Sequence, residues 1–251
     1  MTEALASLKS FVRPLVPKRI LRYWQRRRYE AEQAHYKDKP LNEVFEEIYE
    51  QHTWDRGGSG HYRSGPGSSA RVTQRYEAFV ADYILRHTQI QTLVDIGCGD
   101  FQVSGRILDA LAAQGRQIDY VGCDIAANVI AYNTDTFGRP GVLFKLLDVT
   151  RELPPAGDIV TVREVFQHLS NAHISSALDN LAKCFKRAII TEALTEDVRT
   201  PNVDIISGYR TRDGYHSGVL VDMPPFSRRV VEEHVSTPSP GHRLRTTVVA
   251  L

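Results

Sequence analysis

A glycine turn flanked by carboxylates is the part of this sequence best suited to chemistry. Residues 94–100 read VDIGCGD, so a hydrophobic strand runs into a Gly-x-Gly turn that lets the backbone approach a ligand closely. Gln102 stands where a dinucleotide-binding fingerprint has its third glycine, and no Walker lysine with serine or threonine follows. Nucleoside phosphates are therefore disfavoured as ligands of this turn.

Acidic residues at three predicted strand ends indicate a different ligand. The negative charge of Asp95, two residues before the first glycine, repels pyrophosphate but suits the amine and sulfonium of S-adenosylmethionine. Asp124 and Asp148 end the next two strands, where they can bind two ribose hydroxyls and the adenine amino group. The full set of expected cofactor-binding residues is Ser64, Gly65, Asp95, Gly97, Gly99, Asp124, Ile125, Asp148, Val149 and Arg163.

The segment after the fourth predicted strand indicates which atom would receive a methyl group. Residues 162–165 read VREV and lack the Asn/Asp-Pro-Pro-aromatic motif of enzymes that methylate nucleic-acid base amines. Carbon methylation would need a cysteine nucleophile, and none of the three cysteines is suitably placed (Cys98, Cys123 and Cys184). A hydroxyl acceptor needs a base, and we expect Glu164 and His168, four residues apart on one helix face, to be catalytic.

Alternatives stay open for these residues and for the acceptor site. Glu164 and His168 could instead ligate Mg²⁺ together with substrate hydroxyls and water. In a third interpretation His168 is a helix-surface or cap residue, and Arg163 is the partner of a nearby carboxylate. The long loop at 195–218 either covers the acceptor or is ordinary surface loop. Under the first interpretation, the expected substrate-binding residues are Asp204, Tyr209, Arg210 and His216. The glycine-rich segment 57–67 is either a hinge over the cofactor or a linker.

Strands and helices alternate along the rest of the chain and would position these residues. The fold class predicted is α/β, with a Rossmann-like, doubly wound, mostly parallel seven-stranded sheet and an antiparallel terminal hairpin strand. Strands are predicted at 91–97, 118–124, 142–148, 158–162, 186–194, 229–236 and 243–251, and helices at 41–50, 70–87, 102–114, 126–134 and 171–185.

The N-terminal segment differs from the rest in charge. Residues 1–40 contain ten Lys or Arg and four Asp or Glu, a net charge of +6, so the other 211 residues sum to −5 within the total of +1. We therefore predict a basic amphipathic segment at 1–35 and a catalytic domain at 36–251, with helices and the glycine-rich loop at 36–89 and the Rossmann-like core at 90–251. The segment would contact an anionic membrane surface, pack on the domain, or pack on a second subunit.

Four motifs resemble those of a known family. VDIGCGD, YVGCD, LLDVT and DIVTVREVFQHLS resemble the successive motifs of class I S-adenosylmethionine-dependent methyltransferases over residues 90–194. SGPGSS, HLS, NVDIISGYR and MPPF resemble bacterial methyltransferases associated with polysaccharide and glycolipid modification. The resemblance implies an O-methyltransferase that acts on a sugar hydroxyl of a glycan or glycolipid precursor.

Composition is consistent with that expectation and leaves rivals. The chain has 42% hydrophobic and 24% charged residues, no secretory or membrane-spanning pattern and no extended basic face, so we expect a cytoplasmic protein that does not bind nucleic acid. Small molecules or oligosaccharides are the expected substrates, with a homodimer as one assembly. The rival functions are methylation of another small hydroxylated metabolite and a catalytically silent, cofactor-binding scaffold.

Overall fold

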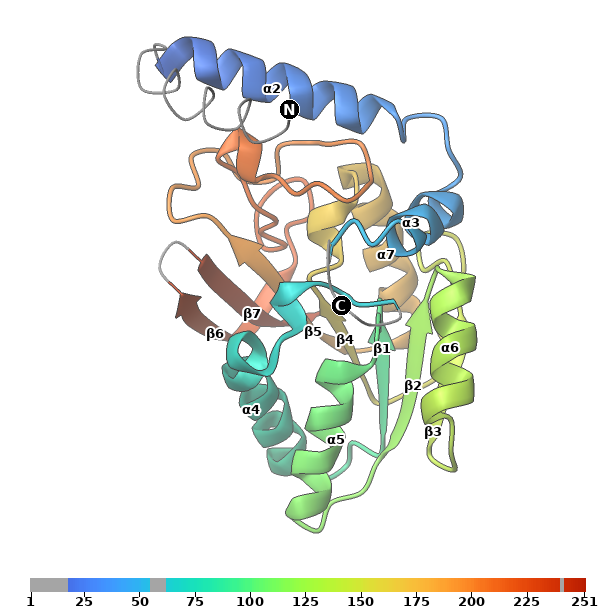
Figure 1. Cartoon of the computed structure of the whole chain (residues 1–251). Coiled ribbons are helices and arrows are strands. Elements are labelled where there is room, and N and C mark those ends of the chain that lie inside the picture. Colours follow the sequence, from blue (N-terminus) through green and yellow to red (C-terminus); the bar gives the residue numbers. More distant parts are fainter. Residues whose placement is uncertain (1–17, 55–61, 240–241) are drawn as a thin grey trace.

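The computed structural model describes residues 18–54, 62–239 and 242–251 of the chain (Figure 1). Its centre is a seven-stranded sheet with the order β3-β2-β1-β4-β5-β7-β6. The five parallel strands are β1 (Thr92–Ile96), β2 (Asp119–Asp124), β3 (Val142–Leu146), β4 (Ile159–Arg163) and β5 (Arg187–Leu194). β6 (Arg229–Ser239) and β7 (His242–Ala250) form an antiparallel hairpin, in which β7 also pairs antiparallel with β5. The predicted fold class is confirmed.

Helices cover both faces of the sheet, which is why the central strands are apolar on both sides. Leu93 of β1 packs in the core cluster formed with α4 (Ala70–Arg86) and α5 (Gln102–Ala113). The next residue, Val94, points to the opposite cluster, which includes α3 (Leu41–Glu50) and α7 (Asn171–Cys184). α6 (Ala127–Phe137) follows β2 and lies beside α3 (Figure 1). Because β1, β2 and β4 are parallel, their carboxyl ends lie at one edge of the sheet.

The helix α2 (Lys18–Ala34) crosses above that edge (Figure 1). The Tyr29 hydroxyl donates to the carbonyl of Thr211, and the Tyr29 ring meets that of Tyr215 edge-on at 5.1 Å. Ile20, Tyr23 and Trp24 are exposed. The predicted boundary at residue 35 thus falls just after a helix whose second half packs on the domain, while residues 1–17 lie outside the described residues.

The segment between β5 and β6 is long but firmly attached. Arg212, 1% exposed, donates to the carbonyls of Phe166, Gln167, Leu169 and Val203 and to the side chain of Asn171. The segment is therefore bound to the connection between β4 and α7. Across the described ranges, none of the helices combines the length and apolar character needed to span a membrane.

Candidate active site

A cavity of about 350 Å³ lies at the carboxyl ends of β1, β2 and β4. In doubly wound folds, ligands bind beyond the strand ends where the strand order reverses, here between β1 and β4. The loop before α4 and the helix α3 form its other walls. Twelve of the predicted site residues line it: Ser64, Gly65, Asp95, Gly97, Asp124, Ile125, Asp148, Val149, Arg163, Glu164, His168 and Tyr209.

The turn after β1 adopts the conformation that its glycines allow. Gly97 has φ +71°, and a Cβ built on it would lie 2.3 Å from the Cγ2 atom of Val165. The turn therefore needs glycine for both its conformation and its space. Gly99, also predicted to bind the cofactor, is not among the residues that line the cavity. A side chain there would collide with the hydroxyl of Ser64 at 2.2 Å, so the second glycine makes room for the chain rather than for a ligand.

Asp95 is buried behind the turn. Its carboxylate accepts hydrogen bonds from Ser104 at 2.6 Å, Thr161 at 2.8 Å and Tyr120 at 2.9 Å. Burial raises the pKa of Asp95, and these hydroxyl donors oppose that rise. Its side chain is thus committed to holding β1, β2, β4 and α5 together, and it contributes negative potential to the cavity from behind.

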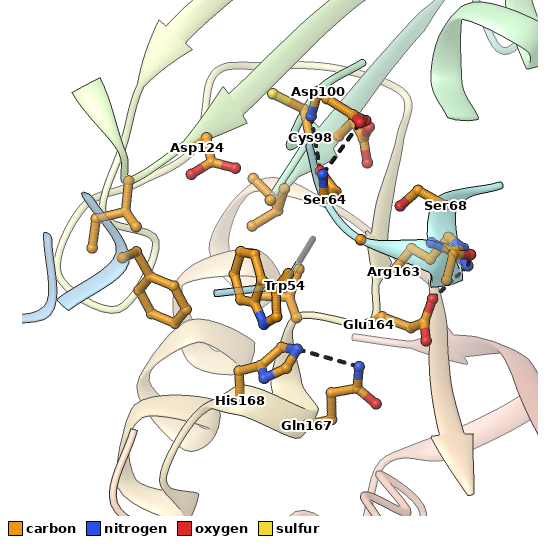
Figure 2. Close-up of a pocket in the computed structure, with 18 of the residues that line it drawn as sticks. Trp54, Ser64, Ser68, Cys98, Asp100, Asp124, Arg163, Glu164, Gln167 and His168 are labelled. Atoms are coloured by element: carbon orange, nitrogen blue, oxygen red, sulfur yellow. Dashed lines mark hydrogen bonds and ion pairs between the residues drawn. The ribbon is translucent and has the colours of Figure 1, made fainter. Parts of the chain in front are cut away.

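Asp124 presents a carboxylate to the cavity at the end of β2 (Figure 2). Oδ1 accepts the N–H of Ala126 at 3.0 Å, and Oδ2 accepts that of Gly99 at 3.1 Å. Each oxygen keeps a second lone pair for a ligand. Burial raises the pKa of Asp124 to about 6, although the backbone N–H groups lower it. This side chain has the position and free acceptors that a pair of ribose hydroxyls requires.

Residues 64–68 cross over the turn and close one side of the cavity. The N–H of Asp100 donates to the Ser64 hydroxyl at 3.0 Å, and the N–H of Ser64 donates back to the Asp100 carboxylate at 3.2 Å (Figure 2). The Arg163 guanidinium donates to the carbonyl of Gly67 at 2.8 Å. The part of the glycine-rich segment that the structure describes is therefore attached to both walls of the cavity, while residues 55–61 lie outside the described residues.

The turn that follows β3 contributes Asp148 and Val149 to the cavity wall. Oδ1 of Asp148 accepts both the N–H and the hydroxyl of Thr150, at 2.9 and 2.6 Å. Oδ2 lies 3.7 Å from the guanidinium of Arg151. Oδ2 is thus the oxygen with capacity left for an amino group, as the predicted contact to adenine requires.

Glu164 adopts a left-handed conformation, with φ +53°, directly after β4. Such backbone strain in a residue with a side chain is concentrated at functional sites. The predicted helix face shared with His168 is wrong, because β4 ends at Arg163 and only Phe166–His168 form a short 3-10 helix, η3. The Glu164 carboxylate is paired with Arg163 instead, whose guanidinium lies 5.4 Å from the ring centre of Tyr76.

His168 faces the cavity next to Trp54 and Gln167 (Figure 2). The ring centres of His168 and Trp54 are 5.2 Å apart, and Gln167 Nε2 lies 3.3 Å from His168 Nε2. Burial lowers the pKa of His168 to about 4, so the imidazole is neutral at physiological pH. Its Nδ1 atom is buried without a hydrogen-bond partner.

Three of the four predicted substrate-binding residues lie away from the cavity, and Tyr209 alone lines it. Asp204 accepts the N–H of Asn171 at 2.7 Å, at the start of α7. Arg210 pairs with Glu32 of α2. His216 is exposed and lies 3.8 Å from Asp197.

The predicted metal pair lacks support from its surroundings. Among the residues that the structure describes, no three His, Cys, Asp or Glu side chains are grouped so that they could hold a metal ion. Glu164 directs its carboxylate at Arg163, which competes with any cation for it.

Two buried groups outside the cavity hold the segment that carries His168. Glu192 of β5, 2% exposed, accepts the N–H groups of Phe166 and Gln167 at 3.0 and 2.8 Å. Arg212 binds the carbonyls of the same two residues. Sequence reasoning missed both, since one glutamate in a strand and one arginine in a loop carry no local signal. It also missed Gln167, although the neighbouring His168 marks the segment.

Comparison with known proteins adds a family to this geometry. Residues 94–187 match a protein family described as a methyltransferase domain. This range includes β1 to β4 and therefore both the glycine turn and the segment that carries His168. No curated protein matches the chain.

Several solved structures share the fold. Magnesium protoporphyrin IX methyltransferase from Synechocystis PCC 6803, with bound S-adenosylhomocysteine, aligns with a TM-score of 0.56 and 13% identity over 84% of this chain and 99% of that one. Human N-acetylserotonin methyltransferase in complex with S-adenosylmethionine aligns with a TM-score of 0.50 and 15% identity over 85% and 61%. The methyltransferase domain of the citrinin polyketide synthase gives 0.51 and 16% over 70% of this chain, which spans about half (51%) of that chain.

The family match and the fold lead to the same class. Residues 94–187 match a methyltransferase domain, and the chain has the fold of a methyltransferase solved with bound S-adenosylhomocysteine. Its cavity fits that cofactor, because Gly97 leaves the space of a side chain beside it and Asp124 offers unused acceptors.

Proposed function

We propose that this protein is an O-methyltransferase whose acceptor is a hydroxyl group of a sugar in a glycan or glycolipid precursor. The observation that carries the proposal is the neutral, buried His168, which lines the same cavity as Asp124. A hydroxyl loses its proton on methylation and benefits from a base, whereas a carboxylate acceptor does not need one. The apolar wall formed by Phe45, Tyr49 and Trp54 suits the C–H face of a sugar ring.

The residues of the chain divide into a cofactor side and an acceptor side. S-Adenosylmethionine, when bound, supplies an electrophilic methyl group on a sulfonium. Asp124 and Asp148 would hold its ribose hydroxyls and adenine amino group, and Ser64, Gly65 and the Gly97 backbone would enclose it. Ile125, Val149 and Arg163 complete that side of the cavity.

On the acceptor side, His168 takes the proton of the hydroxyl as its oxygen gains the new bond to carbon. A pKa of about 4 makes His168 a weak base. His168 is nevertheless a strong enough base, because the oxygen that has gained the methyl group and still carries its proton is a protonated ether, which is a far stronger acid than imidazolium. Deprotonation therefore accompanies bond formation, and the hydroxyl is not ionised beforehand.

The proposal is tested with methyl-labelled cofactor and a panel of glycan precursors and other small hydroxylated metabolites. We expect transfer to a sugar hydroxyl, and His168→Ala should lower turnover about 10²–10⁴-fold with unchanged affinity for S-adenosylhomocysteine. Turnover should survive chelator treatment, because the mechanism needs no Mg²⁺. His173→Ala is the matched control, since His173 bonds to Ser207 and lies outside the cavity. Label found on a carboxylate or amine, or full turnover in His168→Ala, would contradict the proposal.

The exposed face of α2 keeps its separate prediction. Ile20, Tyr23 and Trp24 are exposed beside the basic residues of the segment, as contact with an anionic membrane surface or a second subunit would require.

A further inference from the structure

The outer face of α2 exposes large apolar side chains. Ile20, Tyr23 and Trp24 are 46%, 59% and 66% exposed, and the rings of Tyr23 and Trp24 meet edge-on at 6.2 Å. The three residues are spaced i, i+3 and i+4, so they project from one side of the helix, and the exposed Arg27 continues that side by another turn. Large apolar side chains that gather on one exposed face mark an interaction surface.

The opposite side of α2 is attached to the wall of the cavity. The buried Tyr29 donates its hydroxyl to the carbonyl of Thr211, and Glu32 accepts the hydroxyl of Tyr209 at 2.7 Å. Tyr209 and Thr211 both line the cavity. The outer face of α2 therefore lies about one helix diameter, 10–12 Å, from this wall, across the end of the sheet where the cavity is found (Figure 1).

The charge of the same helix selects the kind of partner. Residues 18–28 contain six Lys or Arg and no Asp or Glu. Basic residues are attracted to anionic lipid headgroups, and tyrosine and tryptophan rings are enriched at the interface between headgroups and hydrocarbon. A helix that combines both features typically lies in the plane of that interface.

Other partners match this face less well. A second copy of the chain, docked by the same face about a twofold axis, would bring six positive charges against six more. A nucleic acid would pair with the charges, but it would leave the apolar side chain of Ile20 without a partner. An anionic lipid surface provides both negative charge and an apolar layer.

We propose that α2 docks along an anionic lipid surface, with Ile20, Tyr23 and Trp24 inserted between the headgroups. Docking in this way holds the wall formed by Tyr209 and Thr211 about one helix diameter from the headgroups. A sugar carried on a lipid would present its hydroxyls near that height. This last consequence rests on the proposed function, whereas the docking itself does not depend on which acceptor the cavity takes.

The full-length chain and vesicles of known composition test the proposal. Trp54→Phe leaves Trp24 as the chain's single tryptophan, so its emission reports directly on the outer face. Vesicles of phosphatidylcholine mixed with phosphatidylglycerol should shift this emission saturably to shorter wavelength, and vesicles of phosphatidylcholine alone should not. Added salt should weaken the response, because it screens exposed charges. Cosedimentation of the wild-type protein with the same vesicles is the second readout.

Variants of the outer face separate its two contributions. In cosedimentation, Trp24→Ala should lower the affinity for anionic vesicles about tenfold or more, because it removes the largest inserted side chain. Arg27→Glu should lower it by a similar factor, because it reverses an exposed charge at the lipid surface. The matched controls are Leu143→Ala, at an exposed leucine of β3, and Arg75→Glu, at an exposed arginine of α4. Both lie on elements away from α2 and should leave the affinity unchanged (Figure 1).

Several results would overturn the docking. They are absence of binding to anionic vesicles, equal binding to both kinds of vesicle, and wild-type affinity in either Trp24→Ala or Arg27→Glu. Binding of RNA or an acidic polysaccharide with no shift of Trp24 emission on vesicles would assign the face to a polyanion instead. If Trp24→Ala fails to fold, Arg27→Glu and the emission of Trp24 decide.

The proposed function fails or stands by a different measurement. Methyl transfer to a water-soluble sugar acceptor needs no vesicles, so Trp24→Ala should keep full turnover there. Vesicle binding without transfer to any sugar hydroxyl would overturn the proposed function and leave the docking intact. Transfer without vesicle binding would do the reverse.

Discussion

Replacing Asp124 by asparagine should weaken S-adenosylhomocysteine binding and remove its pH dependence. In the folded protein each carboxylate oxygen accepts one backbone N–H and keeps one lone pair for a ribose hydroxyl. Asparagine retains one of these two acceptors and no charge. The loss of one charge-assisted hydrogen bond, about 1.5–3 kcal/mol, corresponds to about a ten- to hundredfold higher Kd.

The pH dependence follows from the pKa of Asp124, which burial raises to about 6. Above that pH the carboxylate is ionised and cofactor affinity is full. As the pH falls through about 6 the group is protonated, and affinity falls towards about tenfold per pH unit if only the ionised form binds. The Asp124→Asn variant has no such group and should show a flat profile.

Stability provides the control for this prediction. Because the pKa of Asp124 is higher in the folded protein than its ordinary value of 3.8, the buried ionised carboxylate destabilises the fold increasingly between about pH 4 and pH 6. Asparagine removes that cost of about 3 kcal/mol at neutral pH, against about 1–3 kcal/mol for the N–H group that it leaves unpaired. The variant should therefore unfold near the wild-type temperature.

Calorimetric titration of both proteins between about pH 5 and pH 8 is the assay. Equal affinities at neutral pH in the folded variant would refute the assignment of Asp124 to the ribose. A fall in affinity at low pH that persists in Asp124→Asn would place the titrating group elsewhere. The buried Asp95 and the half-buried Asp100 are the candidates, because burial raises their pKa values too.

Three further predictions concern the fold around the site. Gly97→Ala should destabilise the protein by more than about 2 kcal/mol and weaken cofactor binding, because the φ of +71° is strained for alanine and the added Cβ would meet a neighbouring side chain at 2.3 Å. Urea unfolding and calorimetry measure the two effects, and an unfolding midpoint equal to that of the wild type would contradict the prediction. Arg212→Gln should lower the free energy of unfolding in urea by about 3 kcal/mol or more, because several buried carbonyls lose their hydrogen-bond donor. Arg212→Lys should not restore stability, because an ammonium lacks the planar fork of the guanidinium, and full rescue by lysine would contradict the prediction. A truncated chain that starts at Tyr36 should keep its affinity for S-adenosylhomocysteine, because the residues that line the cavity begin at Leu41, but it should lose about 1.5–3 kcal/mol of stability because the buried Tyr29 is removed. Loss of cofactor binding in the folded, truncated protein would show instead that α2 belongs to the site.

The parts of the structure that the sequence predicts are those decided locally. The runs of β-branched residues and their flanking turns place all seven strands close to their observed ends, because periodicity and turn residues are local properties. Asp124 could be placed at the cavity for a related reason. The last residue of a parallel strand lies at the carboxyl edge of the sheet whatever the helices do.

The parts that the sequence does not predict depend on single conformations or on distant partners. The pair Glu164 and His168 has ideal helical spacing, yet one left-handed residue at Glu164 turns its carboxylate to Arg163. Arg210 has the composition of a sugar-binding residue, but Glu32, 178 positions away in the chain, takes its guanidinium. Nothing local in either segment encodes these outcomes.

Two buried charged groups outside the cavity hold the backbone of η3 in place. On the side away from the cavity, Glu192 binds the N–H groups of Phe166 and Gln167, and Arg212 binds their carbonyls. These bonds fix the backbone that carries Gln167 and His168, two residues that line the cavity. A substrate then meets side chains on a backbone that is already ordered, and its binding does not have to order that backbone. The burial of Glu192, whose pKa rises to about 8, is the energetic cost of that arrangement, and it is placed where no substrate can reach it.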